Sequence, residues 1–178
     1  MEDGIYKGLS QKEYEVIDAL RSSYLVKLLP PSCPAKALLP DKDTQPMAFG
    51  RATHSYILEP EANAIIVSPK FDKRTKQGKA DYEAFTQENA GRHIVSEDEM
   101  QHIIGMRDAV MSHPTAKEFL YKGESEVTIV WTDAETGIKC KCRPDRIPSD
   151  ISDIFVDLKT CESAGREGLI QRSLIGNI

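Results

Sequence analysis

The strongest constraint on the fold is a change of hydrophobic period after Gly123. Beyond this residue three segments alternate apolar with polar residues, as strands with one buried face do. The segments are residues 126–132, 138–143 and 154–160. Turn-forming residues separate them, with Gly137 in the first connection and residues 148–150 in the second. Residues 126–160 are therefore predicted to form three consecutive antiparallel strands.

The pattern before Gly123 is mainly helical. Ser10 and Glu13 have the spacing of a capping box and predict a helix start. Further helices are predicted from residues 22–23 to the prolines at 30–31, and at 47–58, 81–88, 97–113 and 116–120. Residues 64–67 are predicted to be a strand, and residues 1–9 and 30–46 to be irregular. We expect one α+β (mixed α/β) domain, with an antiparallel three-strand meander flanked by helices.

Composition restricts the setting in which the chain works. The apolar stretches are only a few residues long, whereas a membrane-spanning helix needs about 20. The N-terminus is acidic and lacks the apolar run of a secretory signal, so we expect a cytoplasmic protein without membrane contact. The net charge of −5 argues against a surface coated with cations. It remains compatible with a local basic groove, or with carboxylates gathered for metal binding.

The four cysteines favour reduced thiols. Cys140 and Cys142 share one face of a predicted strand, so they do not easily pair with each other. Without a secretory signal, reduced thiols are expected. A zinc site with Cys33 and Cys161 is disfavoured, because closed zinc sites use tighter paired spacing.

The segment Asp157-Leu158-Lys159 carries the functional argument. Residues i and i+2 of a strand point to one face, so Asp157 and Lys159 project side by side while Leu158 enters the core. If the hairpin turn is centred near residue 151, Asp145 lies directly opposite Asp157. Their Cβ atoms would then be about 5 Å apart, where like charges are destabilising.

A divalent cation would relieve this repulsion, since magnesium is commonly held by one or two carboxylates together with phosphate and water. Such a site suits phosphodiester hydrolysis, in which a metal polarises the phosphate and helps to generate hydroxide. Lys159 could orient the attacking water or stabilise the developing charge. The alternative is a surface hairpin with a solvated Asp–Lys pair, because Asp-x-Lys alone is a very common sequence.

The surrounding residues resemble known nucleases. Arg143-Pro144-Asp145, followed by Val156-Asp157-Leu158-Lys159-Thr160, resembles the PD-(D/E)XK signature. The wider matching pieces are Gly4-Ile5-Tyr6 with Leu9-Ser10, Phe49-Gly50-Arg51-Ala52-Thr53-His54, Leu58-Glu59-Pro60, Trp131-Thr132-Asp133 and Cys140-Lys141-Cys142-Arg143-Pro144-Asp145. Together they resemble the exodeoxyribonuclease VIII (RecE-type) nuclease domain of prophages, over nearly the whole chain to Thr160.

The resemblance implies a mixed sheet flanked by helices, with a cleft that admits a DNA end. It implies Mg²⁺- or Mn²⁺-dependent 5′→3′ degradation of duplex DNA for recombination. By matching motif, Asp145 and Asp157 would be metal ligands and Lys159 the catalytic lysine. His54 and the backbone carbonyl of Leu158 would also lie at the metal. The implied partners are double-stranded DNA ends and a single-strand annealing recombination protein, and a homo-oligomer is left open.

Other residues have two interpretations each. Glu126 either supports the site or is a plain surface carboxylate, with the second slightly favoured. Trp131 and Tyr56 are expected in the core, and Cys140 and Cys142 are expected to be small core residues. Cations that could face the DNA backbone, or simply solvent, are Lys70, Lys73, Arg74, Lys76, Lys79, Lys139, Lys141 and Arg143.

The C-terminal part departs from the resemblance. Related nucleases continue with a helix bearing a Gln/Tyr motif and with further strands, whereas Gln171 has no tyrosine four residues on. We therefore expect a core truncated after about residue 160, with weak activity. The alternative to an active exonuclease is a catalytically impaired prophage remnant that acts at most as a metal- or DNA-binding module. An unrelated structural domain is the third reading.

Overall fold

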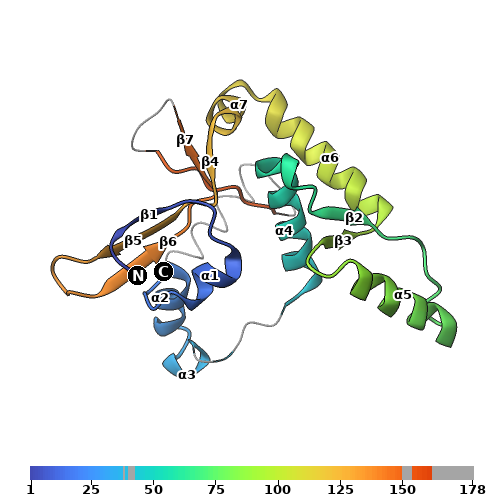
Figure 1. The fold of residues 1–178 in the computed structure, drawn as a ribbon, viewed down its shortest axis with the longest axis horizontal. Helices are drawn as coiled ribbons and strands as arrows, with labels where there is room; N and C mark the ends of the chain where they lie inside the picture. Colours follow the sequence, from blue (N-terminus) through green and yellow to red (C-terminus); the bar gives the residue numbers. More distant parts are fainter. Residues whose placement is uncertain (38, 40–42, 150–153, 162–178) are drawn as a thin grey trace.

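The computed structural model describes residues 1–37, 39, 43–149 and 154–161, and within these ranges its strands lie in three small sheets (Figure 1). The helices are α1 (Gln11–Val16), α2 (Ser22–Leu28), α3 (Pro34–Ala37), α4 (Gln45–Leu58), α5 (Lys76–Glu88), α6 (Glu97–Ser112) and α7 (Pro114–Tyr121), with a 3-10 turn at Pro60–Ala62. The strands are β1 (Gly4–Tyr6), β2 (Ile65–Val67), β3 (His93–Val95), β4 (Gly123–Ser125), β5 (Thr128–Thr132), β6 (Lys139–Cys142) and β7 (Arg146–Pro148). This mixture agrees with the expected α+β class.

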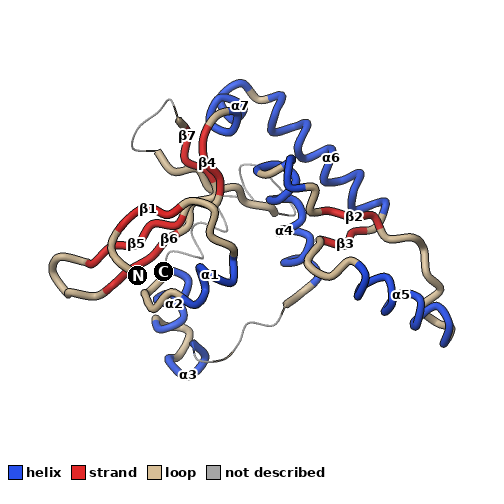
Figure 2. The backbone as a smooth tube through the Cα atoms, in the orientation of Figure 1, coloured by secondary structure: helices blue, strands red, loops and turns tan. Residues whose placement is uncertain are grey.

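Two of these sheets are successive parts of one long hairpin. β4 pairs antiparallel with β7, and β5 pairs antiparallel with β6. Ser125 and Ile129 are four positions apart, and so are their partners Arg146 and Cys142, so the same pairing register continues from one sheet into the other. Figure 2 shows β4 and β5 following one another along the same arm. The first two strands of the predicted meander are therefore confirmed.

The third predicted segment lies beside β7. Val156 and Arg146 exchange both backbone hydrogen bonds, with N···O distances of 2.9 and 3.1 Å, in an isolated antiparallel bridge. In an antiparallel pair, moving one residue back on one strand corresponds to moving one residue forward on the other. The residue before Arg146, Asp145, therefore lies across from the residue after Val156, Asp157. This is the register predicted from the sequence, and it is confirmed at the bridge. The predicted turn centre at residue 151 lies outside the described residues.

Several short elements escaped prediction. β1 pairs with β5, although residues 1–9 were expected to be irregular. β3 pairs in parallel with β2 across the connection that contains α5, and α3 lies within the expected loop 30–46. Strands of three residues and helices of one turn are too short to show a period. The helix α5 also begins earlier than predicted, because the hydroxyl of Thr75 caps it by accepting a bond from the Gly78 N–H.

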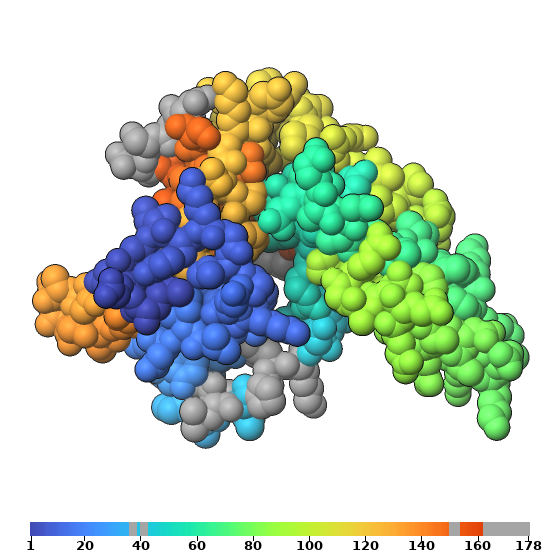
Figure 3. Space-filling model, in the orientation of Figure 1, coloured from blue at the N-terminus to red at the C-terminus, as the bar shows by residue number. Residues whose placement is uncertain are grey.

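The longer helices follow the sequence signals closely. The capping box of Ser10 and Glu13 is present at the start of α1. A second one joins Ser96 and Glu99 at the start of α6. None of the helices in the described ranges combines the length and hydropathy that a bilayer crossing requires. The space-filling view shows the N-terminal elements, in blue, separated by a recess from α4, in teal (Figure 3).

The motif segment is anchored on its apolar side. Val156 and Leu158 pack against Ile57 and Leu58 of α4 and against Leu120 of α7. The intervening Asp157 is exposed, as is Lys159. The alternation predicted for this segment is therefore confirmed, and it places the motif on the helical body of the molecule.

The helix α1 covers one face of the larger sheet. Tyr14 and Ile17 pack against Val130 of β5 to form a separate cluster. Trp131 follows Val130 and points to the opposite face, where it is 40% exposed. The prediction that this tryptophan belongs to the core is wrong, because nothing among the described helices covers that face at its position. Tyr56 packs in the cluster between α4 and α6, as expected.

Lys141 corrects a second prediction. It was expected to face DNA or solvent, yet it is only 5% exposed. Its ammonium donates hydrogen bonds to the carbonyls of Tyr14 at 2.8 Å and Ile17 at 2.7 Å. These carbonyls lie where α1 ends, and each accepts one backbone N–H in addition to the lysine, from Ile17 and from Ala19. The lysine therefore satisfies the end of α1, and its ammonium is not placed to meet a phosphate.

Arg143 is occupied in the same way. Its side chain is 7% exposed, and its guanidinium donates to the carbonyl of Leu9 at 2.6 Å and to the hydroxyl of Thr128 at 3.1 Å. It also lies 4.6 Å from the centre of the Tyr14 ring. The expected role in phosphate contact is wrong for this conformation, because the face opposite the cysteines is covered by α1.

The core position predicted for Cys140 and Cys142 is met only in part. The described residues contain no disulfide, and Cys140 and Cys142 are partly buried on β6. Burial raises the pKa of the Cys142 thiol, which keeps it protonated as a small core residue.

Replacing Lys141 by methionine should destabilise the fold. The apolar side chain removes the charged donor from these two carbonyls, each of which keeps one backbone hydrogen bond, and a hydrogen bond to a charged group contributes about 1.5–3 kcal/mol. Urea unfolding of Lys141→Met should show this loss. Lys139→Met is the matched control, since Lys139 is partly exposed, donates to the Met1 carbonyl and pairs with the exposed Asp3 at 3.8 Å. Equal losses in both variants would contradict the assigned role.

Candidate active site

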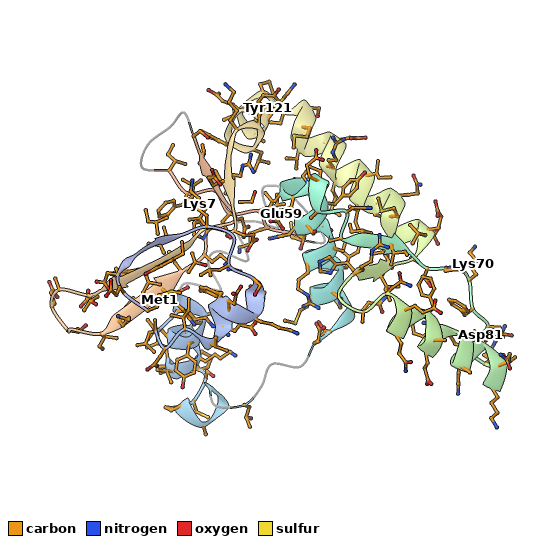
Figure 4. All side chains as sticks on the ribbon, viewed as in Figure 1. Met1, Lys7, Glu59, Lys70, Asp81 and Tyr121 are labelled. Carbon is orange, nitrogen blue, oxygen red and sulfur yellow. The ribbon has the colours of Figure 1, made fainter. Side chains whose placement is uncertain are left out.

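The predicted catalytic residues come from separate elements that meet near the end of α4. Asp145 follows β6, while Asp157 and Lys159 belong to the segment beside β7. His54 lies on α4, and Glu126 lies between β4 and β5. Figure 4 places Glu59, the residue that ends α4, close to the centre of the molecule.

Asp145 and His54 form the inner part of the site. One carboxylate oxygen of Asp145 accepts a hydrogen bond from the backbone N–H of Leu158 at 2.6 Å. The same oxygen lies 3.6 Å from Nδ1 of His54. Both side chains are largely buried, with 14% of Asp145 and 26% of His54 exposed. The motif segment thus holds Asp145 through its own backbone.

Asp157 and Lys159 form the outer part. The ammonium of Lys159 lies 2.6 Å from a carboxylate oxygen of Asp157, and both side chains are exposed. Burial raises the pKa of Asp145, and the charge of Asp157 raises it further. The Leu158 hydrogen bond, His54 and Lys159 oppose that rise. The structure therefore brings Asp145, Asp157, Lys159 and His54 into one site.

Glu126 joins this site from the hairpin. Its backbone has a left-handed φ of 53°, and its N–H donates to the carbonyl of Asp145 at 3.3 Å. Burial, and then the charge of Asp145, raises the pKa of Glu126 to about 7, against the ordinary 4.5. Arg143, at 3.9 Å, opposes this rise. A plain surface carboxylate does not describe Glu126.

Glu59 is a further carboxylate that the residue-by-residue prediction missed. Its charge adds to the rise in the Glu126 pKa, so the two side chains lie within electrostatic reach. A hydrogen-bonded chain fixes their elements together, because the Arg146 guanidinium donates to Ser125 and the Ser125 hydroxyl donates to the Leu58 carbonyl. In the sequence Glu59 appeared only within Leu58-Glu59-Pro60, one of the segments that resemble the nuclease family. No rule of sequence spacing linked it to the other carboxylates.

A close approach between α4 and the motif segment positions His54. A Cβ atom on Gly50 would lie 3.2 Å from the hydroxyl of Thr160. Residues four apart lie on one face of a helix, so position 50 and the side chain of His54 both face this segment. The glycine allows the helix to lie near enough for the imidazole to reach Asp145.

The donor set fits a hard divalent cation. Carboxylate oxygens are the ligands that magnesium prefers, and imidazole suits manganese and related metals. Burial, and to a lesser degree the neighbouring carboxylates, raise the pKa values of Asp145 and Glu126, and a bound cation would stabilise both ionised forms. Within the described residues, however, no three His, Cys, Asp or Glu side chains already stand close enough to hold an ion. The Leu158 carbonyl stays a predicted ligand.

The predicted basic run lies apart from this site. Lys70, Lys73, Arg74 and Lys76 are exposed before and at the start of α5, which projects from one end of the molecule. Figure 4 labels Lys70 at that end, away from Glu59. The ammonium of Lys73 lies 3.4 Å from the centre of the Tyr82 ring. The run is therefore available to a partner, but it does not line the carboxylates.

The comparison with family models assigns the chain to a PDDEXK-like family. The sequence model of one family, described as a PDDEXK-like domain of unknown function (DUF3799), matches residues 30–172. The match covers most of the chain, which therefore belongs to this family. This match supports membership of the PD-(D/E)XK superfamily, but it does not support the more specific resemblance to exodeoxyribonuclease VIII. A comparison with curated proteins found no match.

The raised pKa of Glu126 predicts a pH dependence of stability in the absence of metal. An unfolded glutamate ionises near 4.5, whereas the folded one ionises near 7. The unfolded state therefore holds fewer protons in this window, and the free energy of unfolding falls as pH rises from about 4.5 to about 7.

Glu126→Gln should remove this dependence and be more stable than the parent above pH 7. The gain should be roughly 1–2 kcal/mol, allowing for solvent screening of a side chain that is 33% exposed. Urea unfolding with a chelator between pH 5 and 8 measures it. Parallel pH profiles for parent and variant would count against a perturbed Glu126.

Proposed function

We propose that this chain is a metal-dependent nuclease that hydrolyses phosphodiester bonds in DNA. The observation that carries the proposal is the antiparallel register that sets Asp145 against Asp157-Leu158-Lys159 in a chain of the PDDEXK-like family. His54 at 3.6 Å from Asp145 completes the donor set. In a solvated surface hairpin Asp145 would be exposed, whereas here its carboxylate is largely buried and accepts a hydrogen bond from the backbone N–H of Leu158.

The residues have separable roles in this proposal. Asp145, Asp157 and His54 would hold Mg²⁺ or Mn²⁺, and Glu126 would add negative charge beside them. The cation would polarise the scissile phosphate and lower the pKa of bound water. Lys159, oriented by Asp157 at 2.6 Å, would position the water or stabilise charge on the phosphate. The Leu158 N–H fixes the carboxylate of Asp145.

The narrower activity rests on the sequence resemblance. We propose double-stranded DNA ends as substrate, degraded 5′→3′ in prophage recombination, with a single-strand annealing protein as partner. A cytoplasmic location and a homo-oligomer belong to the same proposal.

A second candidate is a catalytically impaired module that binds metal or DNA without turnover. It is favoured by one observation: in the described residues the donors are not gathered into a ready metal site.

A cleavage assay separates the two candidates. Linear duplex DNA labelled at the 5′ or 3′ end, and a closed circular duplex, are incubated with Mg²⁺, Mn²⁺ or a chelator. Loss of linear DNA only, dependent on metal and absent in Lys159→Met, supports the exonuclease. DNA binding without cleavage under every condition supports the module. Metal-independent cleavage, or full cleavage by Lys159→Met, would reject the proposed mechanism.

Divalent metal binding should depend on both aspartates. Asp157→Asn and Asp145→Asn each remove one anionic oxygen donor, so calorimetry should show at least a tenfold weaker Mn²⁺ site. Asp81→Asn, on the exposed face of α5, is the matched control and should bind as the parent does. Unchanged affinity in Asp157→Asn would exclude this residue as a ligand.

The basic run should contribute salt-dependent DNA affinity. Each lost phosphate contact lowers the slope of log affinity against log salt by about 0.9 on duplex DNA. Lys70→Ala with Lys76→Ala should therefore lower the slope by about 1–2 in titrations with Ca²⁺ in place of Mg²⁺. Lys12→Ala with Lys117→Ala removes the same charge from exposed positions elsewhere. Equal slopes in both double variants would show that only net charge matters.

A further inference from the structure

Phe155 occupies an unusual position beside the candidate site. It is 61% exposed, and it lies two residues before Asp157 on the same face of the segment. The neighbouring Ile154 and Val156 are half-buried, so the alternation leaves the aromatic ring on the open side with Asp157 and Lys159. A single exposed apolar residue needs no explanation by itself. The exposure of Phe155 is explained by the groups that surround its ring.

A cavity of about 380 Å³ lies against this ring, within the range of roughly 300–1,000 Å³ seen for small-molecule sites. Glu126 and Pro144 line it on the side of the carboxylate site. Arg21 contributes a cation near Lys141, whose pKa is lowered first by burial and then by the charge of Arg21. The side chains of two serines, at positions 22 and 23, add hydroxyl groups, and the buried Lys141 and Arg143 also line the cavity.

This lining matches the chemistry of a nucleotide. A phosphate is satisfied by a guanidinium and hydroxyls, and a base stacks on an aromatic face. Two residues of a strand span about 7 Å, and successive nucleotides of a duplex strand rise 3.4 Å each. A base stacked on Phe155 would therefore belong to a nucleotide within about two steps of a phosphate bound to a cation at Asp157.

We propose that Phe155 and this cavity form a subsite for an unpaired nucleotide that neighbours the scissile phosphate, with the ring stacked on the base. The inference rests on the proposed function and deepens it. Stacking tolerates every base, so the subsite would favour a frayed or single-stranded end without selecting sequence. Phe155 acts in substrate positioning, and the carboxylates and Lys159 act on the phosphate.

The test uses the whole chain with Ca²⁺ in place of Mg²⁺ and DNA that carries 2-aminopurine near one end. Parent protein should quench the fluorescence as the base stacks. Phe155→Leu keeps an apolar side chain but removes the ring face, so it should lose the quench and bind this DNA about 5- to 150-fold more weakly. Phe155→Trp should retain both.

In cleavage assays Phe155→Leu should raise KM by a similar factor and leave kcat nearly unchanged, as expected for lost uniform binding. Tyr121→Leu, which removes a ring that is 70% exposed on α7, is the matched control and should change neither quench nor KM. An active Phe155→Leu with parental quench and KM, or equal losses in Tyr121→Leu, would overturn the subsite alone. A parent protein that neither binds nor cleaves DNA would overturn the proposed function and the subsite with it.

Discussion

The pair of backbone hydrogen bonds between Arg146 and Val156 is the contact on which the site depends. A shift of one residue in this register would turn Asp157 and Lys159 into the core and bring Val156 and Leu158 to the surface. The observed register avoids this, because the apolar side of the segment packs on α4 and α7. Burial of hydrophobic residues thus fixes where the charged ones stand.

Charge is distributed in two different ways around the sheet. On the α1 side, Lys141 and Arg143 are buried and saturated by carbonyls, where they hold the N-terminal elements in place. Around Asp145 the carboxylates outnumber the cations, and the pKa values of Asp145 and Glu126 are raised. Lys159 and Arg143 offset part of this negative charge, and a divalent cation bound at the site would offset more of it.

The sequence predicted the local features of this arrangement well. Alternation identified the hairpin and the face of Asp157, and the arithmetic of the turn identified its opposition to Asp145. Both depend on strand geometry alone. The roles of Lys141 and Glu126 could not be found in this way, because they depend on α1 covering one face of the sheet and on the left-handed backbone at Glu126. The contacts of Lys141 with Tyr14 and Ile17, more than a hundred positions away, leave no periodic signal, and neither do those of Glu126.

The most direct test of the account is the position of a bound metal. Paramagnetic broadening by substoichiometric Mn²⁺ can be followed at each backbone amide in nitrogen–proton spectra of the assigned protein. The account predicts the strongest broadening at the amides of His54, Asp145 and Leu158, with Glu126 close behind. Broadening centred on α5, or spread evenly over the acidic surface, would contradict a metal site built by this register.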